Sequence, residues 1–270
     1  MSNEVNETKY LLAIDVGNSN ITFGLMNDKE ILYQWRIQTN LDKTSDEYGI
    51  ELEQILTHFN YTIDSIEDVI IGSVVPDMMH TLPTMCQRFL KKQPIIVGEG
   101  TKTGIPIRLD NPKEVGADRI VNAVAGYEIY RGPLIIVDIG TAITHDVISS
   151  KGEYLGGAIS PGIGIASDAL FKGTAKLPKV ELVTPESAIG KNTIQAMQAG
   201  IVFGYIGLID NITERLISDM EKIGENNPLV IATGGFSALL AQQSAYITKI
   251  DKDLTLQGLR LIYKRTITGR

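Results

Sequence analysis

The sequence predicts an α/β protein built from two similar domains, each a mixed β-sheet flanked by helices. An apolar strand, an Asp-x-Gly turn and a second strand occur twice, in LLAIDVGNSNITFGLM (residues 11–26) and in IIVDIGTAITHDVI (135–148). The segments after each copy alternate between strand and helix patterns. The length of 270 residues suits two domains of about 100–200 residues each.

The repeat extends beyond the two hairpins. A short polar turn follows each copy, at 27–29 and at 150–152, and leads to a third β-rich run, EILYQWRI or EYLGGAIS. The shared order of strand, turn, strand, turn and strand indicates an internal duplication. The aligned positions are Asp15 with Asp138, Gly17 with Gly140, and Asn18 with Thr141.

The remaining segments predict alternating helices and strands. Residues 44–59 have apolar side chains at helical spacing, with Ser45 and Asp46 as candidate N-caps. The later elements expected in the first half are a strand over 66–76 that ends at Pro76, a helix to about Lys91, a strand over 94–98, and a helix over 116–130 that links the domains. Those expected in the second half are a long helix over 191–221, a buried strand over 229–233, a turn into a helix over 234–243, and a closing helix over 254–265. The predicted division is a disordered N-terminal extension at 1–9, a first domain at 10–117 and a second domain at 118–265.

Composition narrows the class of partner. The net charge is −7 without a dense Lys/Arg stripe, so we do not expect nucleic acid as a partner. No apolar run approaches the roughly 20 residues that span a bilayer, and MSNEVNETK lacks a signal-peptide pattern, so we expect a cytoplasmic protein without a membrane partner. Cys86 is the only cysteine and the three histidines are scattered, which excludes an internal disulfide and disfavours a zinc cluster.

Both Asp-x-Gly turns have the chemistry of a phosphate site. Their backbone N–H groups and the side chains of Asn18, Ser19 and Thr141 can hydrogen-bond phosphate oxygens. The aspartate that ends each strand can share a Mg²⁺ ion with those oxygens, because Mg²⁺ prefers one or two carboxylates plus phosphate and water. Either turn alone could be an ordinary polar hairpin loop. The recurrence favours two phosphate clamps facing each other across a cleft between the domains.

A glycine pair, Gly234-Gly235 in ATGGFSALL, supports a nucleotide site. Paired glycines allow a nucleoside to lie directly on the backbone, although a simple tight turn would also use them. The sequence contains neither a Gly-x-Gly-x-x-Gly fingerprint nor a P-loop, which disfavours the two commonest nucleotide-binding motifs.

These features together resemble the superfamily of acetate and sugar kinases, Hsp70 chaperones and actin. Within it the chain resembles the type III pantothenate kinases from about Tyr10 to Lys264. The matching pieces, in order, are DVGNSNITFG, SVVP, NPKEVGADR, DIGTAITHD, GGAISPG, GTAKLP, GKNT and ATGG. The resemblance implies two ribonuclease H-like domains with the active site in the cleft between them.

The resemblance also implies a reaction and its site. The reaction is the ATP-dependent phosphorylation of the 4′-hydroxyl of pantothenate, the first step of coenzyme A biosynthesis, with Asp118 as the general base. The matching position implies that Asp138 binds a monovalent cation, K⁺ or NH₄⁺, and Asp15 is the candidate for Mg²⁺. The family resemblance also implies a homodimer. The implied ATP-binding residues are Asp15, Val16, Gly17, Asn18, Ser19, Asn20, Ile21, Thr22 and Thr141. The implied substrate-binding residues are Gly116, Ala117, Asp118, Arg119 and Thr193.

Simpler interpretations of three of these residues remain open. Asp118 could be the N-cap of the following helix, Arg119 could form an interdomain ion pair, and Thr193 lies at a typical helix start. A different function is also open: a nucleotide-binding transcription accessory or regulatory protein of the same fold. The presence of Asp118 disfavours it.

The chain departs from the family pattern at two positions. Leu109 stands where many members have a tyrosine that contacts substrate, and Ile143 stands where a threonine is usual. His145 and Asp146 follow directly, and we expect His145 to be a half-buried strand residue rather than a catalytic one. The apolar stretch over 194–209 would suit either a dimer interface or a buried helix between domains.

Overall fold

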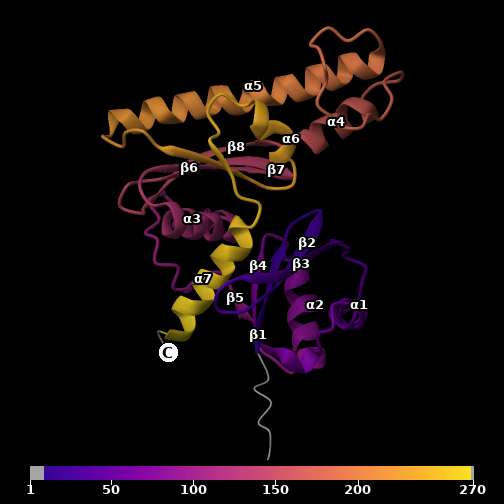
Figure 1. Ribbon diagram of the computed structural model, residues 1–270, viewed down its shortest axis with the longest axis vertical. Coiled ribbons are helices and arrows are strands. Elements are labelled where there is room, and N and C mark those ends of the chain that lie inside the picture. The colour runs from indigo at the N-terminus through magenta and orange to yellow at the C-terminus, as the bar shows by residue number, and fades with distance from the viewer. Residues whose placement is uncertain (1–8, 269–270) are drawn as a thin grey trace, which may run out of the picture. The chain divides into compact units, whose positions relative to one another are not determined.

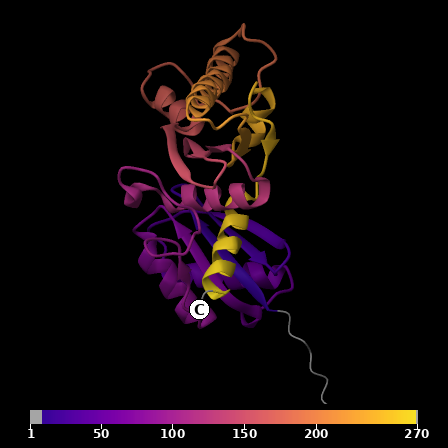
Figure 2. The ribbon, with the colours of Figure 1, turned by 90° about the vertical axis from the view of Figure 1, so that its left-hand side faces the viewer.

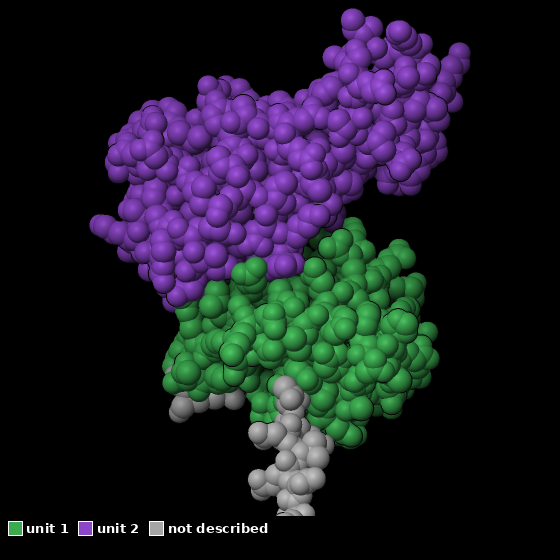
Figure 3. All heavy atoms as spheres, viewed as in Figure 1, with its two compact units in different colours: residues 1–103, 113–121, 255–270 green, residues 104–112, 122–254 purple. Residues whose placement is uncertain are grey.

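The structure, a computed structural model, describes residues 9–268 (Figure 1). Eight of the nine residues of the predicted N-terminal extension lie outside the described part. The chain forms two compact units (Figure 3). Unit 1 comprises residues 1–103, 113–121 and 255–270, and unit 2 comprises residues 104–112 and 122–254. In the described part no helix is both long and apolar enough to cross a bilayer.

Unit 1 contains a mixed five-stranded sheet. Its strands are β1 (Tyr10–Val16), β2 (Asn20–Met26), β3 (Ile31–Gln38), β4 (Ile66–Ser73) and β5 (Ile95–Ile96). The strand order is β3-β2-β1-β4-β5. The central strand β1 pairs antiparallel with β2 and parallel with β4, and β5 continues the parallel side. The strand predicted over 94–98 is therefore real but only two residues long.

Helices cover both faces of this sheet. On one face α1 (Ser45–His58) and α2 (Met78–Met85) bury apolar side chains against alternate residues of β1, such as Leu12 and Ile14. On the other face lies α7 (Leu254–Thr268), drawn in yellow in Figure 2. Its Leu256 and Leu259 side chains approach the backbone at Gly24 and Gly72. A glycine on each strand gives the helix room to pack closely.

The start of α1 differs from the expected one. Thr44, rather than Ser45 or Asp46, is the N-cap: its hydroxyl accepts from the Glu47 backbone N–H at 3.3 Å. The Glu47 carboxylate accepts in turn from the Thr44 backbone N–H at 2.7 Å. This reciprocal capping box satisfies two backbone donors at once, which a lone Ser or Asp cap cannot do.

Unit 2 contains a second mixed sheet with the same arrangement. Its strands are β6 (Leu134–Ile139), β7 (Ala142–Ile148), β8 (Tyr154–Pro161), β9 (Leu229–Thr233) and β10 (Lys249–Ile250). The order is β10-β9-β6-β7-β8, and β6 pairs antiparallel with β7 and parallel with β9. In both sheets, two successive antiparallel pairings lie on one side of the central strand and two successive parallel pairings lie on the other.

The helices of unit 2 again lie on both faces of the sheet (Figure 1). The long helix α5 (Thr193–Lys222) buries residues such as Val202 and Ile209 against one face. The unit 2 part of α3 (Ala117–Tyr130) lies on the other, where Gly126 approaches Ile136. The shorter helices are α4 (Ile163–Lys172) and α6 (Ser237–Leu240), and α6 continues as a 3₁₀ turn over Ala241–Gln243.

The two compact units are each made of several stretches of the chain, whereas the sequence predicts two contiguous domains that meet at 117/118. Residues 255–268 of the closing helix pack with unit 1, whereas residues 104–112 group with unit 2. Within α3 the chain passes from unit 1 to unit 2 between Val121 and Asn122. The closing helix belongs with unit 1 because its leucines fill the second face of that sheet.

His145 is more deeply buried than expected. Its side chain is fully inaccessible, and it lies between Ile143 and Val147 on the face of β7 that packs against α5. Strand alternation places Asp146 on the opposite face. The departure at Ile143 is explained in the same way, since an apolar side chain suits this buried position.

Candidate active site

The first Asp-x-Gly turn ends β1 in unit 1. Asp15 lies in register with Thr22 of β2 and Gly72 of β4. The Gly17 backbone N–H donates to the Asn20 carbonyl at 3.0 Å and closes the turn. The side chains of Asn18, Ser19 and Asn20 are exposed, whereas Val16 and Ile21 are buried in the core. The exposed side chains and the turn's backbone are therefore the groups that a phosphate could contact.

One further residue, absent from the predicted site, supports this turn. Thr39, just after β3, donates its hydroxyl hydrogen to the Gly17 carbonyl at 2.6 Å. Its backbone N–H donates to the Ser19 carbonyl at 3.1 Å. Two bonds from one residue hold both sides of the turn, and no local sequence signal connects Thr39 with residues 17–19.

The second turn ends β6 in unit 2 and is one residue shorter. Asp138 lies in register with Thr144, so each aspartate has a threonine opposite it on the next strand. The Gly140 backbone N–H donates to the Ala142 carbonyl at 3.0 Å. Thr141 is exposed, and its carbonyl accepts from the Gly162 N–H at 3.0 Å.

One carboxylate oxygen of Asp138 accepts a hydrogen bond and the other lies close to a glycine. Asn122 of α3 donates its side-chain N–H to Oδ2 at 3.0 Å. A Cβ added to Gly234 would lie 2.4 Å from Oδ1. Gly234 also has φ +88°, a conformation that glycine adopts without strain. Gly234, the first residue of the glycine pair expected to carry a nucleoside, therefore lies directly beside the Asp138 carboxylate.

The GADR segment, residues 116–119, begins α3 and belongs to unit 1. Asp118 is the second residue of α3, so it is not the N-cap of that helix. It is partly buried and accepts from the Arg119 backbone N–H at 2.8 Å. Burial raises the pKa of the Asp118 carboxyl, and the Arg119 backbone N–H and guanidinium act in the opposite direction. A carboxylate with a raised pKa is a stronger proton acceptor.

Contacts within unit 1 connect this segment with the first turn. The Val74 backbone N–H donates to the Val16 carbonyl at 3.1 Å. A Cβ added to Gly116 would lie 3.7 Å from the Val74 side chain and 2.6 Å from Asp118 Oδ1. The glycine at 116 thus leaves space for the carboxylate of Asp118, and Val74 links the two site segments.

Thr193 is the first residue of α5, as its sequence context predicts. The N-cap is Asn192, whose side-chain oxygen accepts from the Gln195 N–H at 2.9 Å. The side chain of Thr193 is exposed and lines an open apolar groove of about 860 Å³. The other lining residues are Pro161, Ala166, Leu170, Leu177, Ala196, Met197, Gly200, Ile201, Gly204, Tyr205 and Leu208.

The predicted site residues therefore form two sets. Unit 1 holds the ATP-turn residues 15–22 and the GADR segment, and unit 2 holds Asp138, Thr141 and Thr193. In the described part no three His, Cys, Asp or Glu side chains cluster as a metal site would.

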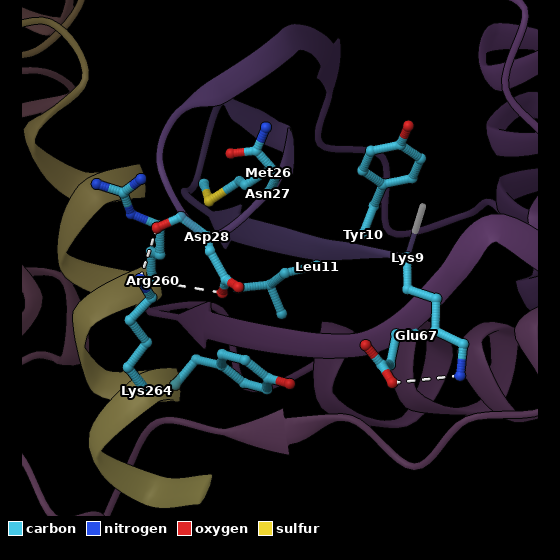
Figure 4. A pocket seen from close by; sticks show the side chains of 10 residues that line it. Lys9, Tyr10, Leu11, Met26, Asn27, Asp28, Glu67, Arg260 and Lys264 are labelled. Carbon is cyan, nitrogen blue, oxygen red and sulfur yellow. Dashed lines mark hydrogen bonds and ion pairs between the residues drawn. The ribbon is translucent and has the colours of Figure 1, made fainter. Parts of the chain in front are cut away.

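A small polar pocket of about 80 Å³ lies elsewhere in unit 1 (Figure 4). It is bounded by the start of β1, the turn after β2 and α7. Lys264 donates to the Asp28 backbone carbonyl at 2.6 Å, and Lys9 pairs with Glu67 at 3.4 Å. None of the predicted site residues lines this pocket, so it is separate from the candidate active site.

A family model described as type III pantothenate kinase matches residues 11–215. A type III pantothenate kinase from Finegoldia magna is 53% identical over 252 residues, covering 93% of this chain and 96% of the relative.

Two solved structures share the fold at low identity. One, from Campylobacter jejuni and described as a Baf family transcriptional activator, gives a TM-score of 0.59 at 22% identity and covers 95% of this chain and 99% of its own. Another, from Sinorhizobium meliloti and described as a 2-dehydro-3-deoxygalactonokinase, gives a TM-score of 0.56 at 12% identity. The match covers 95% of this chain and 96% of that structure. At these identities the likeness concerns the fold alone. The family match and the close relative decide the classification: the chain belongs to the type III pantothenate kinase family.

Proposed function

We propose that the chain transfers the γ-phosphoryl group of ATP to the 4′-hydroxyl of pantothenate, with Asp118 as the general base. The observation that carries the assignment of the base is the environment of Asp118. It lies in the first turn of α3, partly buried, with a raised pKa and with a glycine at 116 that leaves its carboxylate room. A carboxylate placed in this way can accept the proton of an attacking hydroxyl.

We assign the ATP phosphates to the two Asp-x-Gly turns. In the first turn, exposed Asn18, Ser19 and Asn20 supply donors, and Asp15 would hold Mg²⁺ together with phosphate oxygens. In the second turn, exposed Thr141 would contact ATP. Mg²⁺, when bound, neutralises charge on the phosphates during transfer. Pantothenate would be held by Gly116, Ala117, Arg119 and Thr193, with the guanidinium of Arg119 suited to its carboxylate.

Asp138 fits a monovalent cation such as K⁺ or NH₄⁺. Asn122, which donates a hydrogen bond to it, carries no charge, so this bond does not neutralise the carboxylate. Gly140 and Gly234 lie beside the carboxylate, with added Cβ atoms 3.6 Å and 2.4 Å from Oδ1, so the chain leaves room next to this oxygen. The cation, when bound, supplies positive charge beside the phosphate turn.

We propose further that each unit is a ribonuclease H-like domain and that the active site lies between the two. The identical order and direction of strands in the two sheets support a duplication. The distribution of site residues over both units supports a shared site.

We also infer a homodimer in which a second copy covers the apolar groove on α4 and α5. Gly200 and Gly204 expose the backbone of α5 to open space, and Leu170 and Ile194 are exposed nearby. Small residues four apart allow another helix to approach closely, and an exposed apolar patch of this kind is typical of an interface. Sedimentation or light scattering of wild type and of Gly204→Glu tests this arrangement, because a monomeric wild type would refute it.

The proposed reaction is tested by measuring ADP release from MgATP with and without pantothenate, in the presence and absence of K⁺ or NH₄⁺. We expect turnover that requires both pantothenate and the monovalent cation, and that is lost in Asp118→Asn. A folded protein that binds ATP but releases no ADP with pantothenate would refute the kinase proposal. It would instead favour a nucleotide-binding transcription accessory role.

A further inference from the structure

Asn122 is a buried polar residue that donates a hydrogen bond to Asp138, the proposed cation ligand. Only 1% of its surface is accessible, and it lies on α3 among apolar residues such as Val121 and Ala123. Its Nδ2 donates to Asp138 Oδ2 at 3.0 Å. A buried amide needs such partners, because leaving a polar group unpaired in the interior is unfavourable.

This hydrogen bond favours one orientation of the carboxylate plane of Asp138. With Oδ2 held by Asn122, Oδ1 lies against the backbone of Gly234 and near Gly140, whose added Cβ atoms would be 2.4 Å and 3.6 Å away. A carboxylate turned to another plane would lose the bond from α3, whereas a half-turn only exchanges its two equivalent oxygens. Asn122 thus selects one orientation of Asp138 in which a single oxygen points toward both glycine turns.

The chemistry of an amide suits this task better than that of a charged donor. A lysine or arginine at 122 would also orient the carboxylate, but it would neutralise the charge that attracts a cation. An amide orients without neutralising. Groups that orient a metal ligand in this way typically affect metal affinity by about 10–100-fold when removed.

We propose that Asn122 is a positioning residue for the monovalent-cation site, acting through the carboxylate of Asp138. The inference rests on the proposed role of Asp138 and goes beyond it by assigning the residue that sets its orientation. Asn122 follows Asp118 by four residues in α3, so the two residues lie on the same face of one helix. The helix that carries the proposed base therefore also carries the group that orients the cation ligand.

The test compares Asn122→Leu, which keeps the side-chain size and removes the donor, with wild type. Tyr130→Phe is the matched control, because it removes a 2.8 Å hydrogen bond from the same helix to a different carboxylate, Asp251. Two quantities are measured: the K⁺ or NH₄⁺ concentration for half-maximal activation, and the rise in Tm on replacing choline chloride with KCl without substrates. The Tm measurement does not depend on enzymatic turnover.

We expect Asn122→Leu to raise the half-activating concentration at least about tenfold and to reduce the KCl-induced rise in Tm. The KM for ATP should stay within about twofold in the presence of saturating cation, and Tyr130→Phe should match wild type in both cation measurements. In an Asp138→Asn background, adding Asn122→Leu should change the KCl-induced rise in Tm no further. If Asn122→Leu does not fold, Asn122→Ser, which is smaller and remains polar, takes its place in every comparison.

Two results would overturn the proposal. One is an unchanged cation response in a folded Asn122 variant. The other is a further loss of the KCl effect when Asn122→Leu is added to Asp138→Asn, because Asn122 would then act independently of Asp138. Failure of the underlying function is distinguishable, since it would show in wild type as an absence of pantothenate-dependent turnover or of any cation effect.

Discussion

His145 and Asp146 are neighbours in the chain, but their side chains lie on opposite faces of β7. His145 packs beside Ile143 in the core under α5. Asp146 accepts hydrogen bonds from the Tyr154 hydroxyl at 2.6 Å and the Thr144 hydroxyl at 3.0 Å. The pair is therefore not a catalytic dyad, and each residue affects the stability of unit 2 in its own way.

Protonation of His145 should destabilise the protein in mild acid. Burial lowers the pKa of His145 to about 4, and the Ile209 backbone acts weakly in the opposite direction. The unfolded chain, with a histidine pKa of about 6.5, therefore binds more protons between these values. The contribution of His145 to stability is present above pH 6.5 and is lost as the pH falls toward 4, by up to about 1.4 kcal/mol per pH unit.

Urea unfolding at pH 7 and pH 5 measures this effect. His145→Leu should lose less stability between the two pH values than wild type does. The control His58→Gln changes an exposed histidine at the end of α1 and should keep the wild-type pH dependence. Equal pH dependence in His145→Leu and wild type would contradict the prediction.

The bond from Tyr154 to Asp146 should contribute substantially to stability. Both side chains are fully buried, and the acceptor is a carboxylate. Removing the hydroxyl in Tyr154→Phe should lower the free energy of unfolding by about 1.5–3 kcal/mol, the range for hydrogen bonds to charged groups. Tyr127→Phe removes an exposed 3.2 Å bond to the Ser150 carbonyl and should cost much less. If both variants lost a similar free energy of unfolding, the burial of the bond to Asp146 would not increase its contribution to stability.

Periodicity in the sequence was enough to predict most elements and the two Asp-x-Gly turns. The long helix expected over 191–221 is α5, and the register of Asp15 with Thr22 and of Asp138 with Thr144 follows from the hairpins. These features are local, so neighbouring residues determine them. The full burial of His145 was also within reach, since it alternates with Ile143 and Val147 along β7.

Long-range partners were not predictable in this way. The apolar positions of α7 indicate an amphipathic helix, but only the structure shows that Leu256 and Leu259 cover the sheet of unit 1. The bond between Asn122 and Asp138 joins a helix to a strand, and a single asparagine in a helix carries no signal for its partner. The roles assigned to the site residues remain predictions that the experiments described here test.

The close approach of Gly162 to the second turn should make that position intolerant of a side chain. A Cβ at Gly162 would lie 2.2 Å from the Thr141 carbonyl oxygen and 2.4 Å from that of Gly140. Gly162→Ala must therefore displace the turn, and we expect a KM for ATP raised severalfold with lowered stability. Gly98→Ala is the control, because nothing lies within 4 Å of its added Cβ. A wild-type KM in Gly162→Ala would argue against a role of this turn in binding ATP.

Asp118→Asn should separate catalysis from folding. Removing a general base costs about 10²–10⁴-fold in rate, so kcat should fall by that amount while pantothenate binding is largely kept.

The folding stability of Asp118→Asn, in contrast, should be kept or increased. Burial raises the pKa of Asp118, so its contribution to folding stability is present at low pH, where the carboxyl is protonated. That contribution is lost as the pH rises through the raised pKa, because the charged carboxylate must then stay partly desolvated. The uncharged amide avoids this cost and can still accept from the Arg119 N–H, so the free energy of unfolding at pH 8 should equal or exceed that of wild type. Single-turnover kinetics and urea unfolding of the same preparations check both parts. A variant that is inactive and also destabilised at pH 8 would indicate that Asp118 organises the start of α3 rather than accepting a proton.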